Sequence, residues 1–468
     1  MQDMVTKMPN AHEPKEKDLV YMANLLRQIN AINDTHPEEL MLSKTLFPFL
    51  KKQKYLSGEE KDLPSLPVVK PGSKGIVLAI GRWQARFAAH LITSIRKEFN
   101  LTDVPIQIMH AGTDDLPEEH KAYLIKLGGG DTPETAHLCF ATDMTTIFDD
   151  STIDMRHAGF GVKPFAMLAS SFEHTLFLDA DAVFLQDPTL GFEFDDYKAT
   201  GAYFFHDRLM YKGAFKDRLK FYHDLLDGEE NPNSQVNKSR VFMEGYAEEM
   251  DSGALYLNKA APGLKLAIMF TCWMASKQQK KFVYSKFHGD KESYWIAFEL
   301  LRVAYRFEER YASVIGWDCT PSDKKDADPM HFVNNRVCGN NIMHMAAAPY
   351  SPKKLFWFNG SILPNYFVHN RLYFVPTHFM LPDQHIPVTW PEGESPSTMA
   401  DPGGRWERQG DYTKEMGAMW MQGGKIWDLV KDQEDGLEVS NRLLMMQQLA
   451  QRIDQEMIDK KLITLRSD

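Results

Sequence analysis

Two aspartates, Asp179 and Asp181, interrupt a strongly apolar run that extends from Phe177 to Phe184. Burying two carboxylates without compensation is costly, so we expect them beside a cation or at an exposed strand end. Side chains at positions i and i+2 of a strand face the same side, so both can reach one ion at the carboxyl edge of a sheet. Hard oxygen ligands suit Mn²⁺ or Mg²⁺. Such an ion would bridge the diphosphate of a nucleotide-sugar and neutralise the leaving group.

The same pair also fits a haloacid-dehalogenase-like phosphatase, in which Asp179 is the nucleophile and Asp181 the acid/base. That class requires a later Gly-Asp pair followed closely by another acid. Gly289-Asp290 supplies the pair, but Tyr294 and Trp295 stand where the acid is expected. The phosphatase therefore stays as an alternative with an incomplete motif, and a glycan-binding module without catalytic activity is a third possibility.

Two further acids stand beside predicted secondary structure. Asp290 comes directly before a predicted helix, where an aspartate commonly caps the first turn. Asp251 lies just before Gly253, which opens a predicted strand. Because glycine there permits the close approach of a sugar, Asp251 is a candidate for orienting a donor or an acceptor.

Strands and helices alternate around these acids. The run from Ile76 to Ile80 is continuously apolar, which is typical of a strand buried on both faces. Phe87, Leu91 and Ile95 then recur at helical spacing, and a second strand completes a βαβ unit. The predicted strands cover residues 76–80, 105–109, 175–178, 199–205 and 253–257, and further predicted helices cover 163–171, 264–276 and 292–307. This alternation predicts an α/β fold with a central, mostly parallel sheet.

The two ends of the chain have a different character. Residues 1–70 are charged and broken by prolines, which predicts a stem or wrapping segment. One amphipathic helix is expected there, with apolar positions at Met22, Leu25, Ile29 and Ile32. Residues 385–411 are rich in Pro, Gly and charge and predict a long loop or lid. A terminal helix then packs on the body through Met445, Leu449, Ile453 and Met457.

Composition and charge exclude several classes of protein. The 468 residues are 43% hydrophobic and 12% aromatic, which is enough for a large core and unlike a disordered chain. Lys and Arg number 53 against 64 Asp and Glu, giving a net charge of −11. Since no basic run offers a stripe that could follow a phosphate backbone, we expect no nucleic acid partner.

The cysteines and the apolar runs bear on the compartment. The four cysteines lack the paired short spacings of a zinc site, whereas Cys319 and Cys338 could close a modest disulfide loop. No stretch approaches the roughly 18 to 20 apolar residues of a membrane helix, so we expect membrane attachment only through an anchor absent from this chain. Tripeptides that accept glycans in a secretory lumen begin at Asn33, Asn100, Asn237 and Asn359.

Several ordered segments between Gly75 and Asn365 together resemble the fungal Golgi α-1,3-mannosyltransferases. These segments are Arg86-Phe87-Ala88-Ala89-His90-Leu91-Ile92, Ala111-Gly112-Thr113-Asp114-Asp115-Leu116, Lys163-Pro164-Phe165-Ala166, Phe177 to Pro188, Asp251-Ser252-Gly253, His288-Gly289-Asp290-Lys291-Glu292-Ser293-Tyr294-Trp295 and Leu355-Phe356-Trp357-Phe358-Asn359-Gly360. The resemblance implies a type A glycosyltransferase (GT-A) fold, which is Rossmann-like and binds a nucleotide-sugar. It also implies domains at 1–70 (stem), 71–384 (catalytic) and 385–468 (lid loop and C-terminal helix).

The resemblance also assigns roles to individual residues. Asp179 and Asp181 hold the metal and nucleotide, and His344 occupies the place of a third metal ligand. His-Phe-Asp is usual at that place, whereas Met345-Ala346 follows His344 here. Asp290 would face the donor sugar, with Asp251 as a second catalytic candidate. The candidate donor-binding residues are Arg86, Lys163, Asp179, Lys291, Asn359 and Gly360.

The expected activity is that of a retaining, metal-dependent glycosyltransferase. It would move mannose from GDP-mannose to a mannose-containing oligosaccharide or glycoprotein, forming an α-1,3 linkage, with Mn²⁺ or Mg²⁺ as cofactor. The resemblance implies a Golgi lumen location and a type II membrane protein in full-length form. Related type A enzymes use UDP-sugars with a similar acidic pair, so a UDP-sugar donor remains a further alternative.

Overall fold

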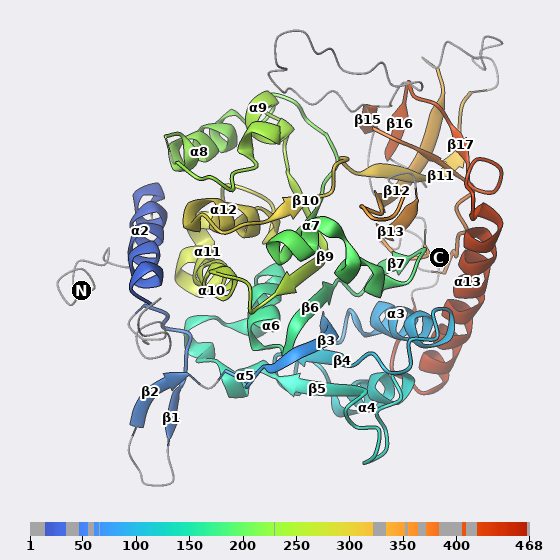
Figure 1. Cartoon of the computed structure of the whole chain (residues 1–468). Helices are drawn as coiled ribbons and strands as arrows, with labels where there is room; N and C mark the ends of the chain where they lie inside the picture. Colours follow the sequence, from blue (N-terminus) through green and yellow to red (C-terminus); the bar gives the residue numbers. More distant parts are fainter. Residues whose placement is uncertain are drawn as a thin grey trace.

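The computed structural model describes residues 15–33, 46–54, 60–64, 66–228, 230–321, 334–351, 354–363, 371–382, 405–408 and 419–465. Its centre is a seven-stranded sheet with the order β10-β8-β9-β6-β3-β4-β5 (Figure 1). The strands are β3 Lys70–Ala79, β4 Ile106–His110, β5 Cys139–Asp143, β6 Phe172–Leu178, β8 Ala202–His206, β9 Met250–Asn258 and β10 Arg306–Phe307. Four of the six pairings are parallel, and β9 runs antiparallel to both of its neighbours. The predicted α/β class and mostly parallel sheet are confirmed.

Helices cover both faces of this sheet, and the strand residues alternate between two cores. Ile76 and Leu78 of β3 pack with α3 Ala85–Lys97 and α4 Glu118–Leu127. Val77 packs on the opposite face with the helices α6 Lys163–Ala169, α10 Leu264–Ala275 and α12 Lys291–Leu301. Apolar side chains are therefore needed at every position, which is why the sequence shows a continuous apolar run there.

A second, antiparallel sheet begins directly after the acidic pair. Strand β7 Ala182–Phe184 pairs with β13 Leu355–Asn359, which in turn pairs with β12 Arg336–Met345. The remaining strands are β11 Ser313–Asp318, β14 His378–Met380, β15 Arg405–Arg408, β16 Met419–Gln422 and β17 Trp427–Asp428. This sheet brings residues from the late part of the chain next to Asp181.

The N-terminal segment contributes a helix and a small hairpin. Helix α2 Glu16–Asn33 packs on α12 and on α8 Lys216–Leu226, as its amphipathic pattern predicts. Met22 and Leu25 are buried, whereas the side chains of Ile29 and Ile32 lie outside the described residues. Strands β1 Lys52–Lys54 and β2 Glu60–Pro64 form the hairpin. The shorter helices are α5 Met144–Ile147, α7 Asp195–Thr200, α9 Arg240–Glu244 and α11 Lys277–Val283.

The terminal helix α13 Gly436–Asp459 packs along α3, but one predicted contact is wrong. Leu449, Ile453 and Met457 are buried, whereas Met445 is 45% exposed and Met446 is buried instead. An α-helix has 3.6 residues per turn, so each step of four advances about 40° around the axis. Repeated steps of four therefore leave the buried face, which mixed steps of three and four follow.

Two other predicted boundaries differ from the structure. The helix expected over residues 292–307 ends at Leu301, because Arg302 adopts a left-handed φ of +60° and the chain then forms β10. Part of the loop expected over residues 385–411 is strand β15, which pairs with β16. Residues 385–404 and 409–411 lie outside the described part of the chain. Among the helices that the structure describes, none is long and apolar enough to span a bilayer.

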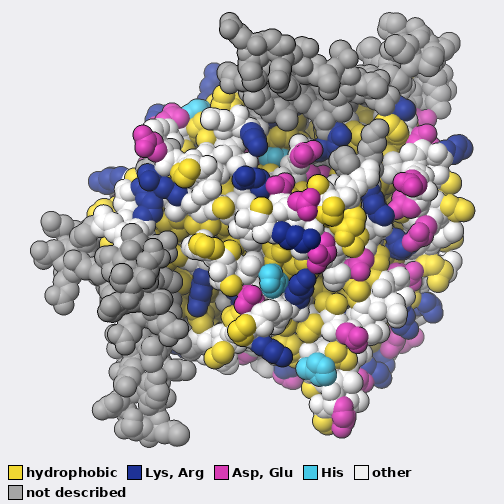
Figure 2. Space-filling model, viewed as in Figure 1, with side chains coloured by type: hydrophobic (Ala, Val, Ile, Leu, Met, Phe, Trp, Pro, Cys, Tyr) yellow, Lys and Arg dark blue, Asp and Glu magenta, His cyan; other side chains and the backbone are white. Residues whose placement is uncertain are grey.

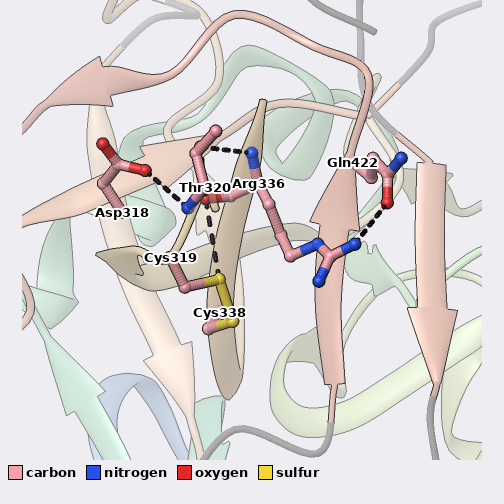
Figure 3. Close-up of a disulfide and its surroundings, with 6 residues drawn as sticks. All are labelled: Asp318, Cys319, Thr320, Arg336, Cys338 and Gln422. Atoms are coloured by element: carbon pink, nitrogen blue, oxygen red, sulfur yellow. Dashed lines mark hydrogen bonds between the residues drawn. A yellow bond between two sulfur atoms is a disulfide. The ribbon is translucent and has the colours of Figure 1, made fainter. Parts of the chain in front are cut away.

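A disulfide joins the two sheet strands β11 and β12. Cys319 directly follows β11 and is bonded to Cys338 of β12, with their Cα atoms 5.8 Å apart (Figure 3). The other cysteines, Cys139 and Cys272, are free thiols and buried. The pairing that the spacing permitted is thus the one present.

Charged side chains on one face of the molecule are distributed in a mixed pattern. Figure 2 shows basic and acidic side chains interspersed on the face that it displays, without a continuous basic stripe among the described residues there. This distribution agrees with the net charge of −11.

Candidate active site

The acidic pair lies beside two neighbouring parallel strands, β3 and β6, whose following connections lead to opposite edges of the sheet. From β3 the chain continues through β4 and β5 on one side and returns to β6 on the other, so the ends of β3 and β6 form a topological switch point. In open α/β sheets, ligands bind in the crevice at this point. Asp179 follows β6, and Asp181 precedes β7. Sequence periodicity placed both residues at this edge, and the structure agrees.

Backbone hydrogen bonds fix the acidic turn from two sides. The Asp179 amide donates to the Gly253 carbonyl at 2.8 Å, and the Ser361 amide donates to the Asp181 carbonyl at 2.7 Å. Both aspartates are half-buried. Burial raises the pKa of Asp179 to about 7, and the Asp181 charge adds to this effect while Lys163 opposes it. The turn thus gathers more negative charge than a single lysine balances.

Lys163 is the cation of this site. Its Nζ lies 2.7 Å from Asp179 Oδ1, 3.2 Å from Ser252 Oγ and 4.0 Å from Asp290 Oδ1. The side chain is 9% exposed. Burial by itself lowers the pKa of Lys163, but Asp179 and Asp290 outweigh it and raise the pKa above its ordinary value. The ammonium group therefore stays charged and joins β6, β9 and the start of α12.

Asp290 lies beneath this lysine and is 2% exposed. Tyr294 donates its hydroxyl to Asp290 Oδ2 at 2.8 Å, and Ser252 Oγ lies 3.4 Å from Oδ1. The Asp290 side chain accepts no hydrogen bond that caps α12, so the ordinary role as an N-cap does not account for it. The predicted candidate is thus brought together with Lys163 and Asp179.

Asp251 and His344 form a separate buried cluster with Glu308. His344 is fully buried. Its Nε2 lies 3.0 Å from Asp251 Oδ2, and its Nδ1 lies 2.9 Å from Glu308 Oε2. Because both ring nitrogens face carboxylates, neither offers a lone pair to an ion. Both ring nitrogens are thus engaged in this arrangement, and the role of His344 as a third metal ligand stays a prediction. Asp251 is also engaged, since Asn359 Nδ2 and the Gly253 amide donate to its Oδ1 at 3.1 Å and 2.9 Å.

Replacing His344 with glutamine should destabilise the fold and change its pH dependence. Burial by itself lowers the pKa of His344, but Asp251 and Glu308 raise it to about 9. A raised histidine pKa gives stability that is complete below about pH 6.5 and is lost as the pH rises through about 9. His344→Gln leaves two buried carboxylates without a cation, at a cost of about 3–5 kcal/mol.

Thermal unfolding between pH 6 and 10 measures this effect. The wild-type melting temperature should fall over that window, and the His344→Gln variant should melt lower and lack this contribution to the slope. His137→Gln, at an exposed position, serves as the matched control. Equal melting curves for wild type and His344→Gln would contradict the assignment.

Arg86 is engaged in a buried ion pair, and its role in binding the donor stays a prediction. Its guanidinium is buried and forms an ion pair with Asp454 of α13, with Nε 2.9 Å from Oδ1. His90 Nε2 lies 2.8 Å from the same carboxylate, and the Tyr373 hydroxyl also donates to it. Asp454 thus anchors the terminal helix on α3.

Two other predicted donor contacts, Lys291 and Asn359, also have internal partners. Lys291 Nζ lies 2.6 Å from Asp207 Oδ2 and also pairs with Glu248, away from Asp290. Asn359 donates to Asp251, and a Cβ at Gly253 would approach its Nδ2 to 2.5 Å. The glycine expected to admit a sugar therefore admits Asn359. Gly360 adopts a φ of +113°, which turns the chain so that the next residue donates to the acidic turn.

A small cleft lies beside Asp181. Its walls come from α3, from the acidic turn, from the end of β13 and from α13. The residues that line it are Phe87, His90, Leu91, Ser94, Ala180, Asp181, Ala182, Val183, Ser361, Ile362, Met446 and Ala450. The terminal helix is therefore part of the surroundings of Asp181 and not only a wrapping element.

The donor set at the acidic turn fits a hard divalent ion held partly by substrate. Among the described residues, no group of three or more His, Cys, Asp or Glu is arranged to hold a metal ion. Mg²⁺ and similar ions, however, commonly bind through one or two carboxylates plus substrate phosphates and water. Asp179 and Asp181 supply two carboxylates, and their mutual repulsion is the kind that such an ion relieves.

Several residues of these clusters escaped sequence reasoning. Glu308 lies in a stretch without a motif, and only its 2.9 Å contact with His344 identifies its role. Glu292 is fully buried and accepts hydrogen bonds from the amides of Glu249 and Met250, so it ties α12 to the start of β9. An acid within an otherwise apolar helical face was the available signal for Glu292.

Comparison with known proteins assigns the chain to a family. The family described as "Mannosyltransferase putative" matches residues 73–346, more than half of the chain. Alpha-1,3-mannosyltransferase MNT2 of Saccharomyces cerevisiae is 25% identical over 313 residues, which cover 63% of this chain and 53% of the relative. Alpha-1,3-mannosyltransferase MNN1 of the same yeast is 22% identical over 326 residues, covering 62% and 41%. The resemblance inferred from the motifs is confirmed.

Each match covers only part of the two proteins compared. Across the first four curated relatives, the chain spans between 26% and 53% of their own length. Among solved structures, the mannosyltransferase Ktr4p from S. cerevisiae is 10% identical with a TM-score of 0.34, covering 66% of this chain and 84% of Ktr4p.

Proposed function

Because the chain belongs to this mannosyltransferase family, we propose that it transfers mannose from GDP-mannose to a hydroxyl group of a mannose-containing glycan. The observation that carries the proposal is the position of Asp179 and Asp181 at the switch point between β3 and β6, joined through Lys163 to the buried Asp290. The GDP donor, the α-1,3 linkage and the Golgi lumen follow from the resemblance to α-1,3-mannosyltransferases.

The proposed site separates donor charge from sugar recognition. Asp179 and Asp181 would hold Mn²⁺ or Mg²⁺, which supplies positive charge to the diphosphate when bound. Lys163 fixes the Asp179 carboxylate at 2.7 Å and carries a second positive charge at the same place. Asp290, oriented by Tyr294, faces the donor sugar and is available to its hydroxyls or to the oxocarbenium-like transition state.

Retention of configuration constrains the acceptor. Among the described residues of the site, no carboxylate is identified as a nucleophile. The Asp251 carboxylate is held by His344, by Asn359 and by the amide of Gly253. We infer that the leaving phosphate oxygens guide the attack of the acceptor hydroxyl on the same face of the sugar. Asp251 then acts as a positioning residue that holds the start of strand β9, where Ser252 contacts Lys163.

A donor panel tests the proposed function. Purified protein with Mn²⁺ is incubated with an α-mannoside acceptor and either GDP-mannose, UDP-galactose or UDP-glucose, and the product linkage is determined by NMR. Only GDP-mannose should give a product, with an α-1,3 linkage, and EDTA should abolish it. A product from a UDP-sugar, or rapid release of phosphate from a generic phosphate ester, would favour the corresponding alternative.

A further inference from the structure

An exposed phenyl ring stands directly above the buried catalytic cluster. Phe160 belongs to the 3₁₀ turn η3 Gly159–Val162, which leads straight into Lys163 at the start of α6. The Lys163 Nζ lies 5.4 Å from the centroid of the Phe160 ring. Phe160 is nevertheless 53% exposed, whereas Lys163 and Asp290 are 7% and 2% exposed. The Phe160 ring thus faces solvent, whereas its neighbours Lys163 and Asp290 are buried.

The turn that presents this ring is held from below. Lys280 Nζ donates to the carbonyls of His157 and Ala158 at 3.4 Å and 3.3 Å, and the Gly161 amide donates back to Ala158 at 3.1 Å. A Cβ at Gly161 would meet the Lys280 side chain at 3.3 Å, so this lysine packs closely against the turn. These contacts of the turn therefore fix the position of the phenyl ring, although the ring itself is exposed.

The segment that leads to Asp290 completes a small aromatic rim. The ring centroid of His288 lies 6.0 Å from that of Phe160, and His288 is exposed. Gly289 adopts a φ of +72°, and a Cβ there would come within 3.0 Å of the Phe160 ring. Glycine thus lets the ring lie against the turn that precedes Asp290. We call Phe160 and His288 the aromatic rim.

We propose that the aromatic rim is the subsite for the acceptor, and that a neutral hexoside stacks on Phe160 with its hydroxyls facing His288. A hexose has an apolar C–H face and a polar edge, which match an exposed phenyl ring beside an imidazole. The inference rests on the proposed function and adds where the second substrate binds.

The chemistry and the position of the rim both favour a neutral acceptor over the nucleotide. A phenyl ring supplies no charge for a phosphate group, whereas it suits the C–H face of a neutral hexose. The nucleoside is expected at the switch point beside β3. Phe160 instead lies on the α6 and α12 side of Asp179, as its contacts with Lys163 and Gly289 indicate.

Steady-state kinetics of Phe160→Ala provide the test. The acceptor KM should rise about tenfold, as expected for loss of a stacked aromatic contact. The donor KM should stay within about twofold of the wild-type value, and the melting temperature should equal that of the wild type within error. Phe160→Tyr should restore the acceptor KM. Phe215→Ala is the matched control, because Phe215 is also an exposed phenyl ring, at 42%, on α8's N-terminal side.

Direct binding separates this inference from the proposed function. Saturation-transfer NMR with methyl α-mannobioside, without donor, should show contact with the wild type and a weaker signal with Phe160→Ala. An unchanged acceptor KM and an unchanged NMR signal in Phe160→Ala would overturn the rim as acceptor subsite. If the wild type transfers no mannose from GDP-mannose, the proposed function fails, and the NMR experiment still decides the fate of the rim.

Discussion

Replacing Asp181 with alanine should lower mannose transfer by about a thousandfold while the protein stays folded. The side chain is half-buried between β6 and β7, in the cleft between α3 and α13. Its carbonyl still accepts the Ser361 amide in the variant, because that hydrogen bond uses only the backbone. The loss should therefore fall on catalysis and on ion binding, and not on the turn itself. Initial rates with GDP-mannose and a titration of Mn²⁺ measure both.

The matched control is Asp195→Ala, which removes an exposed carboxylate at the start of α7. That variant should transfer mannose at the wild-type rate. Thermal unfolding of Asp181→Ala should stay within a few degrees of wild type, and added Mn²⁺ with GDP-mannose should stabilise the wild type more than the variant. Substantial transfer by Asp181→Ala in a metal-free assay would refute the role proposed for the pair.

The acidic turn could be predicted from the sequence because its signal is local. Two carboxylates within an apolar run need an exposed strand end or a cation. Asp179 directly follows strand β6, and the ammonium of Lys163 lies 2.7 Å from its carboxylate. The strands of the central sheet were predictable for the same reason, since a strand buried on both faces requires a continuous apolar run. Lys163 was also found, although its partners Asp179 and Asp290 became evident only from the fold.

The partners of Arg86 and His344 could not be predicted from the sequence, because the contacts of a charged side chain depend on the tertiary structure and not on its position in the chain. Arg86 stands at the nucleotide end of α3, yet its partner Asp454 lies 368 positions later. His344 follows a plausible spacing, yet its ring nitrogens face carboxylates 93 and 36 positions away. Buried charges must be paired, and the pairing follows tertiary contacts that no local pattern contains.

Replacing Lys163 with methionine should cost about 3–5 kcal/mol of folding free energy and remove most of the transfer activity. Methionine fills nearly the same volume, so the loss comes from charge and not from a cavity. Without the ammonium, the carboxylates of Asp179 and Asp290 remain buried together without a cation beneath Phe160. Urea unfolding and initial rates with GDP-mannose measure the two consequences separately.

A double-mutant cycle distinguishes this pairing from a general sensitivity of the α6 terminus. If Lys163 mainly compensates Asp179, then Lys163→Met combined with Asp179→Asn should be more stable than Lys163→Met alone, because the second change removes the carboxylate left without its partner. Lys216→Met, at an exposed position on α8, is the control and should be neutral. Additive losses in the double variant would mean that the two side chains are not coupled, and the charge balance inferred at the acidic turn would then be wrong. If the two changes are coupled and transfer is lost, Lys163 is the group that keeps the Asp179 carboxylate ionised and in place at the switch point.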